Sequence, residues 1–232
     1  MLDFAHTRIS FHRSIWSYSK VQFFVTPVIR NRKAFMNRKT AGLILDVGCG
    51  KNSHAQNINL DYDWYAGIDV CCDITRGLPF QNGYVGGIFT EHCIEHIRFD
   101  DALFVFREFY RIIAPGAWVR IVVPDLELYV DRYDAFRTTG TLSMPNTKGD
   151  VRQDGIYSPA MSINRIFREH GHRFIYDFAT LNAMLETVGF VEIRKAKFGE
   201  SQDSRLLLDT PTREIESLYV EAQRPREGGA PI

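Results

Sequence analysis

A glycine turn that directly follows a short apolar run is the first sign of a binding site. The run, residues 43–47 with the sequence LILDV, leads into Gly48-Cys49-Gly50. Its length and composition predict a strand buried on both faces. Two glycines one residue apart permit positive φ and carry no Cβ, so a ligand can lie against bare backbone. In an open α/β sheet this position is the carboxyl end of a strand, where ligands bind.

Carboxylates occupy the apolar runs that follow this turn. Residues 58–61, INLD, end in Asp61, and residues 68–74, IDVCCDI, contain Asp69 and Asp73. An acid at the end of the strand after the turn can accept hydrogen bonds from both hydroxyls of a ribose. The usual spacing of about 20 residues favours Asp69 for that role. The compressed spacing of this chain leaves Asp61 as the alternative.

Residues 91–96, EHCIEH, carry several groups that could do chemistry. They contain the spacing H-x-x-E-H, which is also an inverted zincin pattern with two histidines on one helical face. A zincin site needs this pattern inside a long helix with a third ligand, whereas here it follows a predicted strand. We therefore expect no metal site. Capping of the next helix by Glu95 and His96 would explain these two residues as well as catalysis does.

A second polar cluster lies at residues 164–176, NRIFREHGHRFIY. Exposure to solvent is enough to explain Arg165 and Arg168. His172 and Tyr176 lie in a more apolar context, which makes them candidates for contact with a substrate.

The pattern of apolar residues predicts the elements that position these groups. Strands are expected at residues 43–47, 58–61, 68–74, 85–90 and 118–123. A helix beginning near Asp100 and Asp101 would place its apolar face on Leu103, Phe106, Tyr110 and Ile113. Strand and helix alternate through residue 125, which predicts a doubly wound α/β fold with a parallel sheet. Beyond it we expect helices at 126–139 and 176–188, a long polar loop at 140–158, and an antiparallel pair of strands at 191–197 and 218–222.

These motifs resemble those of the class I S-adenosylmethionine-dependent methyltransferases. Residues 67–80 (GIDVCCDITRGLPF), 111–125 (RIIAPGAWVRIVVPD) and 168–178 (REHGHRFIYDF) are similar to a narrower group often associated with surface-polysaccharide synthesis. Ala114 and Ala117 depart from that group's pattern but leave the turn plausible. The resemblance covers residues 42–222. It implies a Rossmann-like, mostly parallel seven-stranded sheet with an antiparallel C-terminal edge strand.

The resemblance also implies S-adenosylmethionine as the cofactor. Aligned with the narrower group, Asp61 rather than Asp69 would hold the ribose, Asp73 would lie beside the adenine, and the glycine turn would hold the methionine end. The residues expected to bind the cofactor are Asp46, Gly48, Cys49, Gly50, Asp61, Asp73, Ile74, Thr90 and Glu91.

Methyl transfer asks the protein to align donor and acceptor and, for a hydroxyl acceptor, to remove a proton. Histidine is the natural base near neutral pH. The candidates are His92, His96 and His172, in that order, with Glu95 as the residue that orients the base. The expected acceptor is a hydroxyl of a saccharide or glycoconjugate. The alternatives are another small metabolite, or a non-catalytic subunit that binds the cofactor for a partner. Neither the acceptor's identity nor the oligomeric state follows from the sequence.

Composition limits the remaining possibilities. The chain has 232 residues, 45% hydrophobic and 24% charged, which suits one methyltransferase domain at 41–222, with acceptor-side elements at 126–190. Its 28 basic and 28 acidic residues give no overall field that would attract nucleic acid. The four cysteines match neither a zinc ribbon nor a disulfide framework, so we expect a reduced, cytoplasmic protein.

Charge is unevenly distributed near the N-terminus. Residues 1–40 contain eight Lys or Arg residues, interleaved with aromatic residues, and Asp3 as the single acid. We expect a helical arm that packs over the cofactor site. The alternative is an arm that makes peripheral contact with an anionic inner membrane surface. No apolar run is long enough to span a bilayer or to form a signal peptide, and residues 223–232 are expected to form a flexible tail.

Overall fold

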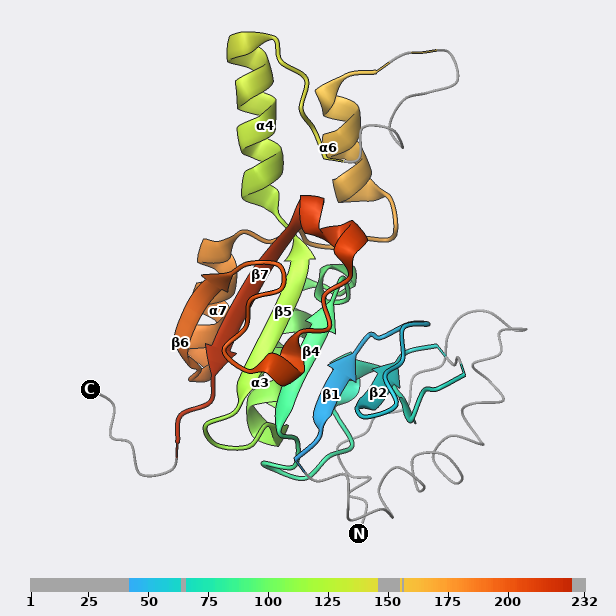
Figure 1. The fold of residues 1–232 in the computed structure, drawn as a ribbon, viewed down its shortest axis with the longest axis vertical. Helices are drawn as coiled ribbons and strands as arrows, with labels where there is room; N and C mark the ends of the chain where they lie inside the picture. The colour runs from blue at the N-terminus through green and yellow to red at the C-terminus, as the bar shows by residue number, and fades with distance from the viewer. Residues whose placement is uncertain (1–41, 64–65, 146–154, 156, 227–232) are drawn as a thin grey trace.

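The computed structural model describes residues 42–63, 66–145, 155 and 157–226. Its centre is a seven-stranded sheet in the order β3-β2-β1-β4-β5-β7-β6. The first five strands in that order are parallel, and β7 runs antiparallel to both of its neighbours (Figure 1). The strands are β1 (Ile44–Val47), β2 (Ile58–Asp61), β3 (Val70–Cys71), β4 (Gly87–Glu91), β5 (Trp118–Pro124), β6 (Val191–Ala196) and β7 (Ser217–Gln223). The predicted fold class is confirmed. In detail, the antiparallel strand β7 lies one place inside the edge, which β6 forms.

Helices α3 (Phe99–Ile112) and α7 (Phe178–Val188) cover one face of the sheet (Figure 1). The buried positions of α3 are Ala102, Val105, Phe106, Phe109 and Ile112. This stripe at helical spacing is offset from the predicted face. Of the four residues predicted for that face, Phe106 is the one that both belongs to the helix and is fully buried. Asp100 and Asp101 lie in the first turn rather than at the N-cap, which is Arg98. There they still favour the helix through its dipole.

The opposite face carries a smaller core formed by the chain that precedes β7. Leu206, in the short 3₁₀ helix η5 (Ser204–Leu206), packs with Ile44, Phe89, Val122 and Tyr219 from the sheet. Figure 1 shows this orange-red segment in front of the strands. A second 3₁₀ helix, η6 (Pro211–Glu216), then carries the chain to the carboxyl edge of the parallel strands, where β7 begins.

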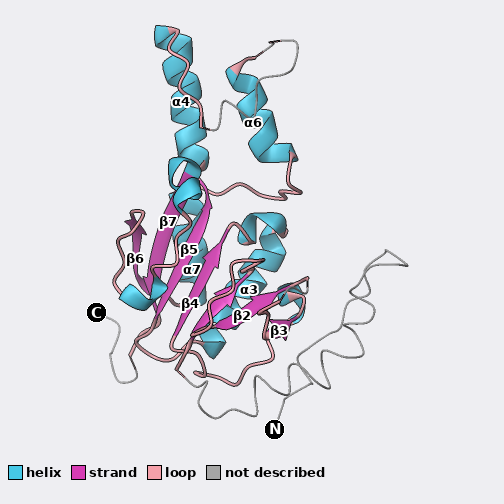
Figure 2. Ribbon diagram, turned by 45° about the vertical axis from the view of Figure 1, so that its right-hand side comes forward, coloured by secondary structure: helices cyan, strands magenta, loops and turns pink. Residues whose placement is uncertain are grey.

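Two helices extend beyond that edge, α4 (Leu126–Thr139) and α6 (Pro159–Arg168) (Figures 1 and 2). Helix α4 has the predicted bounds and begins at Asp125, whose carboxylate accepts hydrogen bonds from the backbone N–H of Glu127 and Leu128. Helix α6 was not predicted. A small core joins the pair, built from Tyr129, Met144, Ile166 and Ile175. Residues 146–154 and 156 of the predicted loop lie outside the described residues.

The predicted arm at residues 1–40 and most of the tail also lie outside the described residues. The predicted tail, residues 223–232, begins too early in the sequence. Gln223 is the last residue of β7, and Arg224 Nη1 donates to the Ile113 carbonyl at 2.6 Å. Among the residues that the structure describes, none forms a helix both long and apolar enough to cross a membrane.

Candidate active site

The predicted glycine turn lies at the carboxyl end of β1. Gly48 has a φ of 74° and Gly50 a φ of 56°, conformations that side-chain-bearing residues rarely adopt. A Cβ on Gly48 would lie 2.5 Å from Cys93 Sγ, whereas a Cβ on Gly50 would meet no atom within 4 Å. The two glycines therefore differ in what they require. Gly48 lets the β4 loop approach closely, and Gly50 leaves open space above the turn.

The larger of two pockets at this edge has a volume of about 850 Å³, and Asp61, Asp73 and Ile74 line it. Asp61, at the end of β2, accepts a hydrogen bond from the Gly50 backbone N–H at 2.8 Å, which ties the acid to the glycine turn. Burial raises the pKa of Asp61. Asp73 caps the 3₁₀ helix η3 (Ile74–Arg76) by accepting from the Thr75 backbone N–H at 3.0 Å.

The carboxylate of Asp69, in contrast to that of Asp61, has a structural role. Its Oδ2 accepts hydrogen bonds from the backbone N–H of Asn59 at 2.9 Å and from Asn59 Nδ2 at 3.1 Å. It lines neither of the two pockets at this edge. Asp69 thus fixes the start of β2, and Asp61 is the acid that faces the larger pocket.

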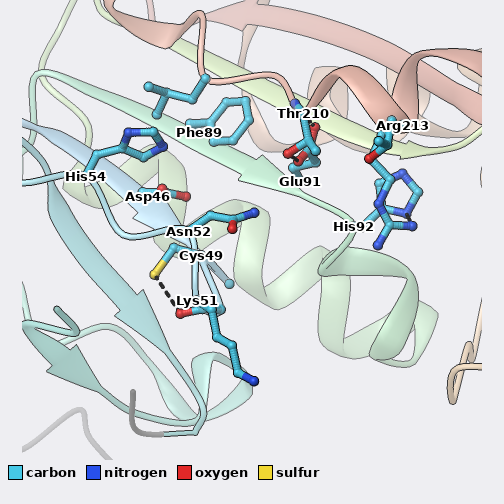
Figure 3. Close-up of a pocket in the computed structure, with 14 residues that line it drawn as sticks. Asp46, Cys49, Lys51, Asn52, His54, Phe89, Glu91, His92, Thr210 and Arg213 are labelled. Atoms are coloured by element: carbon cyan, nitrogen blue, oxygen red, sulfur yellow. Dashed lines mark hydrogen bonds between the residues drawn. The ribbon is translucent and has the colours of Figure 1, made fainter. Parts of the chain in front are cut away.

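The smaller pocket, of about 520 Å³, is lined by Asp46, Cys49, Gly50 and Glu91 among others (Figure 3). Glu91, at the end of β4, accepts hydrogen bonds from the Thr210 backbone N–H at 2.9 Å and from Thr210 Oγ1. Burial, and next the charges of Glu91 and Asp61, raise the pKa of Asp46 to about 7. Gly48 and His92 line both pockets, so the two spaces meet beside them.

These features fit the S-adenosylmethionine that the sequence resemblance implies. The 850 Å³ pocket offers carboxylates to hydroxyl and amine groups, and Asp46 and Glu91 in the adjoining pocket suit the cationic amino group of a methionine moiety. The open space above Gly50 leaves backbone accessible between them. Of the residues expected to bind the cofactor, Thr90 alone lines neither pocket, because its side chain is fully buried inside β4.

His92 follows β4 at the junction of the two pockets. Its Nε2 lies 2.8 Å from Ser217 Oγ, and its Nδ1 lies 3.3 Å from Glu95 Oε1 and 3.4 Å from Arg213 Nη1. Figure 3 shows Arg213 beside the imidazole ring. Burial, and next the Arg213 charge, lower the pKa of His92 to about 3. The ring is therefore neutral at neutral pH.

The remaining predicted catalytic residues gather behind His92. Glu95 and His96 belong to the 3₁₀ helix η4 (Ile94–His96), so the segment is not the long helix that a zincin requires. Glu95 is fully buried, and burial raises its pKa to about 8. His96 lines the larger pocket. His172 lines neither pocket but its ring centroid lies 4.9 Å from that of His96.

Several pocket residues were missed by sequence reasoning. Thr210, Thr212 and Arg213 line the smaller pocket, and Arg173 lines the larger one. The first three come from the segment before β7, which has no helical or strand periodicity that would place it. The only local signal is the Thr-Pro-Thr sequence at 210–212, which is typical of a turn.

Comparison with known proteins gives the family. A family model described as a methyltransferase domain matches residues 24–195, well over half of the chain. No curated protein matches the chain. A solved S-adenosylmethionine-dependent methyltransferase from Mesorhizobium loti is similar over 82% of this chain and 94% of its own, with 16% identity and a TM-score of 0.50.

Two further solved structures are similar at lower TM-scores. A methyltransferase from Archaeoglobus fulgidus has 14% identity and a TM-score of 0.47, and the match covers 89% of this chain and 100% of that one. A Haemonchus contortus phosphoethanolamine N-methyltransferase has 17% identity and a TM-score of 0.44, with 84% of this chain and 51% of that one covered. From the family match, supported by the fold, the chain belongs to the class I S-adenosylmethionine-dependent methyltransferases.

Proposed function

We propose that this methyltransferase acts on a hydroxyl group of a saccharide or glycoconjugate. The observation that carries the hydroxyl assignment is the position of His92, whose largely buried imidazole lies where the two pockets meet. A pKa near 3 makes this ring a weak base, so the assignment rests on its position and not on its pKa. An alcohol must lose its proton when it is methylated, and a neutral imidazole can accept that proton. The saccharide assignment rests on the sequence resemblance to the polysaccharide-associated group.

S-adenosylmethionine supplies an activated methyl group when it is bound, so the chain's own task is to hold and orient the reactants. We assign Asp61 to the ribose hydroxyls and Asp73 with Ile74 to the adenine. Asp61 Oδ2 accepts from Gly50 and Oδ1 accepts from the Asp63 backbone N–H at 2.8 Å. A carboxylate has about four lone-pair sites, so Asp61 can accept a ribose hydroxyl in addition to these backbone bonds.

The methionine moiety is assigned to the smaller pocket. Asp46 and Glu91 would face its amino group, and Gly48, Cys49 and Gly50 would supply backbone along it. A cationic ammonium next to Asp46 favours the ionised carboxylate, which burial alone disfavours.

His92 is the proposed general base, and Glu95 is a positioning residue. Glu95 Oε1 lies 3.3 Å from His92 Nδ1, on the opposite ring nitrogen from Ser217. These contacts hold the imidazole in one orientation between the two pockets. His96 and Arg173, which line the larger pocket, are assigned to the acceptor side.

Cofactor binding is tested first, by calorimetry with S-adenosylhomocysteine. Gly48→Val should abolish affinity, since the new side chain would displace Cys93 and distort the glycine turn, whose Gly50 N–H binds Asp61. Undiminished affinity in a folded Gly48→Val protein would mean that the site lies elsewhere. Circular dichroism of the same sample checks its fold.

The acceptor is then tested with labelled S-adenosylmethionine and a panel of free, nucleotide-linked and lipid-linked sugars beside amine acceptors. We expect an O-methylated saccharide, identified by mass spectrometry. His92→Asn should lower the rate by about 10²–10⁴-fold with S-adenosylhomocysteine affinity kept. Asparagine is chosen because His92 has a φ of 48°, which asparagine tolerates. Transfer to amines alone, or an unchanged rate in His92→Asn, would contradict the proposal.

A further inference from the structure

Two histidines and a carboxylate from different parts of the chain converge behind the pockets. Glu95, His96 and His172 each offer one potential ligand atom, and these atoms all lie within 4.8 Å of one another. Backbone hydrogen bonds hold the two segments together, because the N–H groups of Arg173 and Phe174 donate to the Glu95 carbonyl at 2.7 and 3.2 Å. The backbone fold itself therefore brings the three residues close together.

The Glu95 carboxylate is the least satisfied group of the three. Its side chain is fully buried, and within the described part of the chain neither of its oxygens accepts a hydrogen bond. His92 Nδ1 lies 3.3 Å and His96 Nε2 3.9 Å from Oε1. A buried carboxylate is costly unless it is hydrogen-bonded, paired with a cation or bound to a metal. This side chain has the environment of a ligand.

The histidines are oriented as metal ligands usually are. His172 Nδ1 lies 2.5 Å from the Ile166 carbonyl oxygen, which can only accept, so this nitrogen carries the proton and Nε2 keeps its lone pair. A ligating histidine typically donates its other N–H to a backbone carbonyl in this way. His96 presents Nε2 to Glu95, while its Nδ1 lies on the side of Gly171, where an added Cβ would come within 3.9 Å.

We propose that Glu95, His96 and His172 bind a divalent transition-metal ion of the zinc class. Two imidazoles and one carboxylate suit such an ion and leave further coordination positions open. Ligand atoms of a tetrahedral zinc site lie roughly 3.3–3.5 Å apart. The present spacing of up to 4.8 Å is wider, so binding requires the ligands to move inward, and the 38% exposed side chain of His96 has room to do so.

This ligand set differs from the one that the H-x-x-E-H spacing would predict. His92 is outside it, because the atoms within 4.8 Å of one another belong to Glu95, His96 and His172. His172, which is distant in sequence, takes the third place. The site adjoins the larger pocket through His96. Its open positions could therefore receive an acceptor oxygen, a consequence that rests on the proposed function.

The test uses the full-length protein, stripped of metal with a chelator and titrated with zinc chloride alone in calorimetry. We expect one zinc per chain, with affinity reduced at least about tenfold by Glu95→Gln and by His172→Ala. The matched control is His170→Asn, which removes the neighbouring imidazole, 5.8 Å from His172 between centroids, at a position with a φ of 60°. Its zinc affinity should stay within about twofold of the unmodified protein, since His170 is not one of the three ligands.

Cobalt(II) substitution keeps the proposal testable if a variant misfolds. The unmodified protein should show visible absorption from nitrogen and oxygen ligands without a strong thiolate charge-transfer band. A strong thiolate band would assign the ion to the four free cysteines and overturn the proposal. So would the absence of stoichiometric zinc, or unchanged affinity in both Glu95→Gln and His172→Ala.

Binding of S-adenosylhomocysteine, measured on the same metal-free samples, separates this proposal from the proposed function. Retained binding with no zinc uptake would refute the metal site alone. Zinc uptake without S-adenosylhomocysteine binding would refute the cofactor assignment alone.

Discussion

At the scale of single residues, the acidic residues near the glycine turn have different roles, although their sequence contexts are similar. The general spacing rule favoured Asp69, and the family resemblance favoured Asp61. In the structure Asp69 is taken up by two hydrogen bonds from Asn59, while Asp61 reaches the larger pocket. Spacing could not decide between them because the strands β2 and β3 are unusually short, with four and two residues.

Substitution of these two acids should therefore have separable effects. Asp61→Ala should weaken S-adenosylhomocysteine binding by about 1.5–3 kcal/mol, roughly ten- to a hundredfold, because hydrogen bonds to a charged acceptor are lost. Asp69→Ala should lower the melting temperature with a smaller loss of affinity, since Asn59 loses its partner. Calorimetry and thermal unfolding of both variants measure this. A larger affinity loss at Asp69 would show that the ribose assignment is shifted.

Asp46 should make stability depend on pH. Burial, and next Glu91 and Asp61, raise its pKa from 3.8 to about 7, so the folded protein favours the protonated acid. Its contribution to stability is complete below pH 3.8 and is lost as pH rises toward 7. Relative to Asp46→Asn, the unmodified protein should lose on the order of a few kcal/mol of unfolding free energy across this window.

Denaturant unfolding of both proteins at several pH values measures that difference. Saturating S-adenosylhomocysteine should reduce the loss, because an ammonium beside Asp46 stabilises the ionised form. Parallel pH profiles for the two proteins would show that Asp46 is not the group that titrates.

At the scale of elements, the parallel strands and α4 could be predicted because each carries its own local pattern. Helix α6 was missed because its charged residues, such as Arg165 and Arg168, were interpreted as a polar cluster, although Pro159, Ser162 and Ile166 form a buried stripe at helical spacing. The segment before β7 could not be predicted. Its position depends on a buried arginine in another strand rather than on any local periodicity.

That arginine is Arg120 in β5, whose guanidinium holds the segment against the sheet. It donates to both oxygens of Asp209 at 2.7 and 2.6 Å, to Glu221 at 3.0 Å and to the carbonyl oxygens of Lys197 and Glu200 at 2.9 and 2.8 Å. The side chain is fully buried. Thr210, which binds Glu91 in the smaller pocket, directly follows Asp209.

Arg120→Leu should therefore destabilise the protein by about 3–5 kcal/mol, because two buried carboxylates lose their partner. Denaturant unfolding measures the change. Arg137→Leu is the matched control, since the 3.5 Å pair of Arg137 with Asp134 is exposed on α4, and its removal should change stability little. Equal effects of the two substitutions would show that the Arg120 network does not anchor the segment.

At the scale of the whole molecule, the candidate site is assembled from regions that the sequence keeps far apart. The residues proposed to bind the cofactor, from Asp46 to Glu91, lie in one stretch of sequence, and their candidacy could be argued from that stretch alone. Arg213, Ser217 and His172 reach the same edge only because β7 inserts between β5 and β6 and because the segment after α6 pairs with Glu95. Such long-range packing produces no pattern in the local sequence. The positions of Arg213, Ser217 and His172 relative to the site could therefore be found only from the structure.

Localisation is also a property of the whole molecule, and here we propose peripheral association with an anionic membrane on the cytoplasmic side. The proposal rests on the sequence of residues 1–40, which contains eight basic residues and a single acidic one, whereas the whole chain has zero net charge. Each basic residue near an anionic surface contributes on the order of 1 kcal/mol, so a few give reversible binding that salt weakens. A lipid-linked acceptor would make such binding useful.

Sedimentation of the full-length protein with anionic vesicles should therefore show pelleting at low salt and less at high salt, since screening weakens attraction between exposed charges. Replacing Arg30, Arg32, Lys33 and Arg38 with glutamine should reduce pelleting at low salt. The matched control replaces four exposed arginines of the domain, Arg107, Arg132, Arg137 and Arg168, with glutamine. Because both variants lose the same charge, only a contribution from the arm makes them differ. Equal pelleting by the two variants, or none by the unmodified protein at low salt, would remove the arm from any role at a membrane.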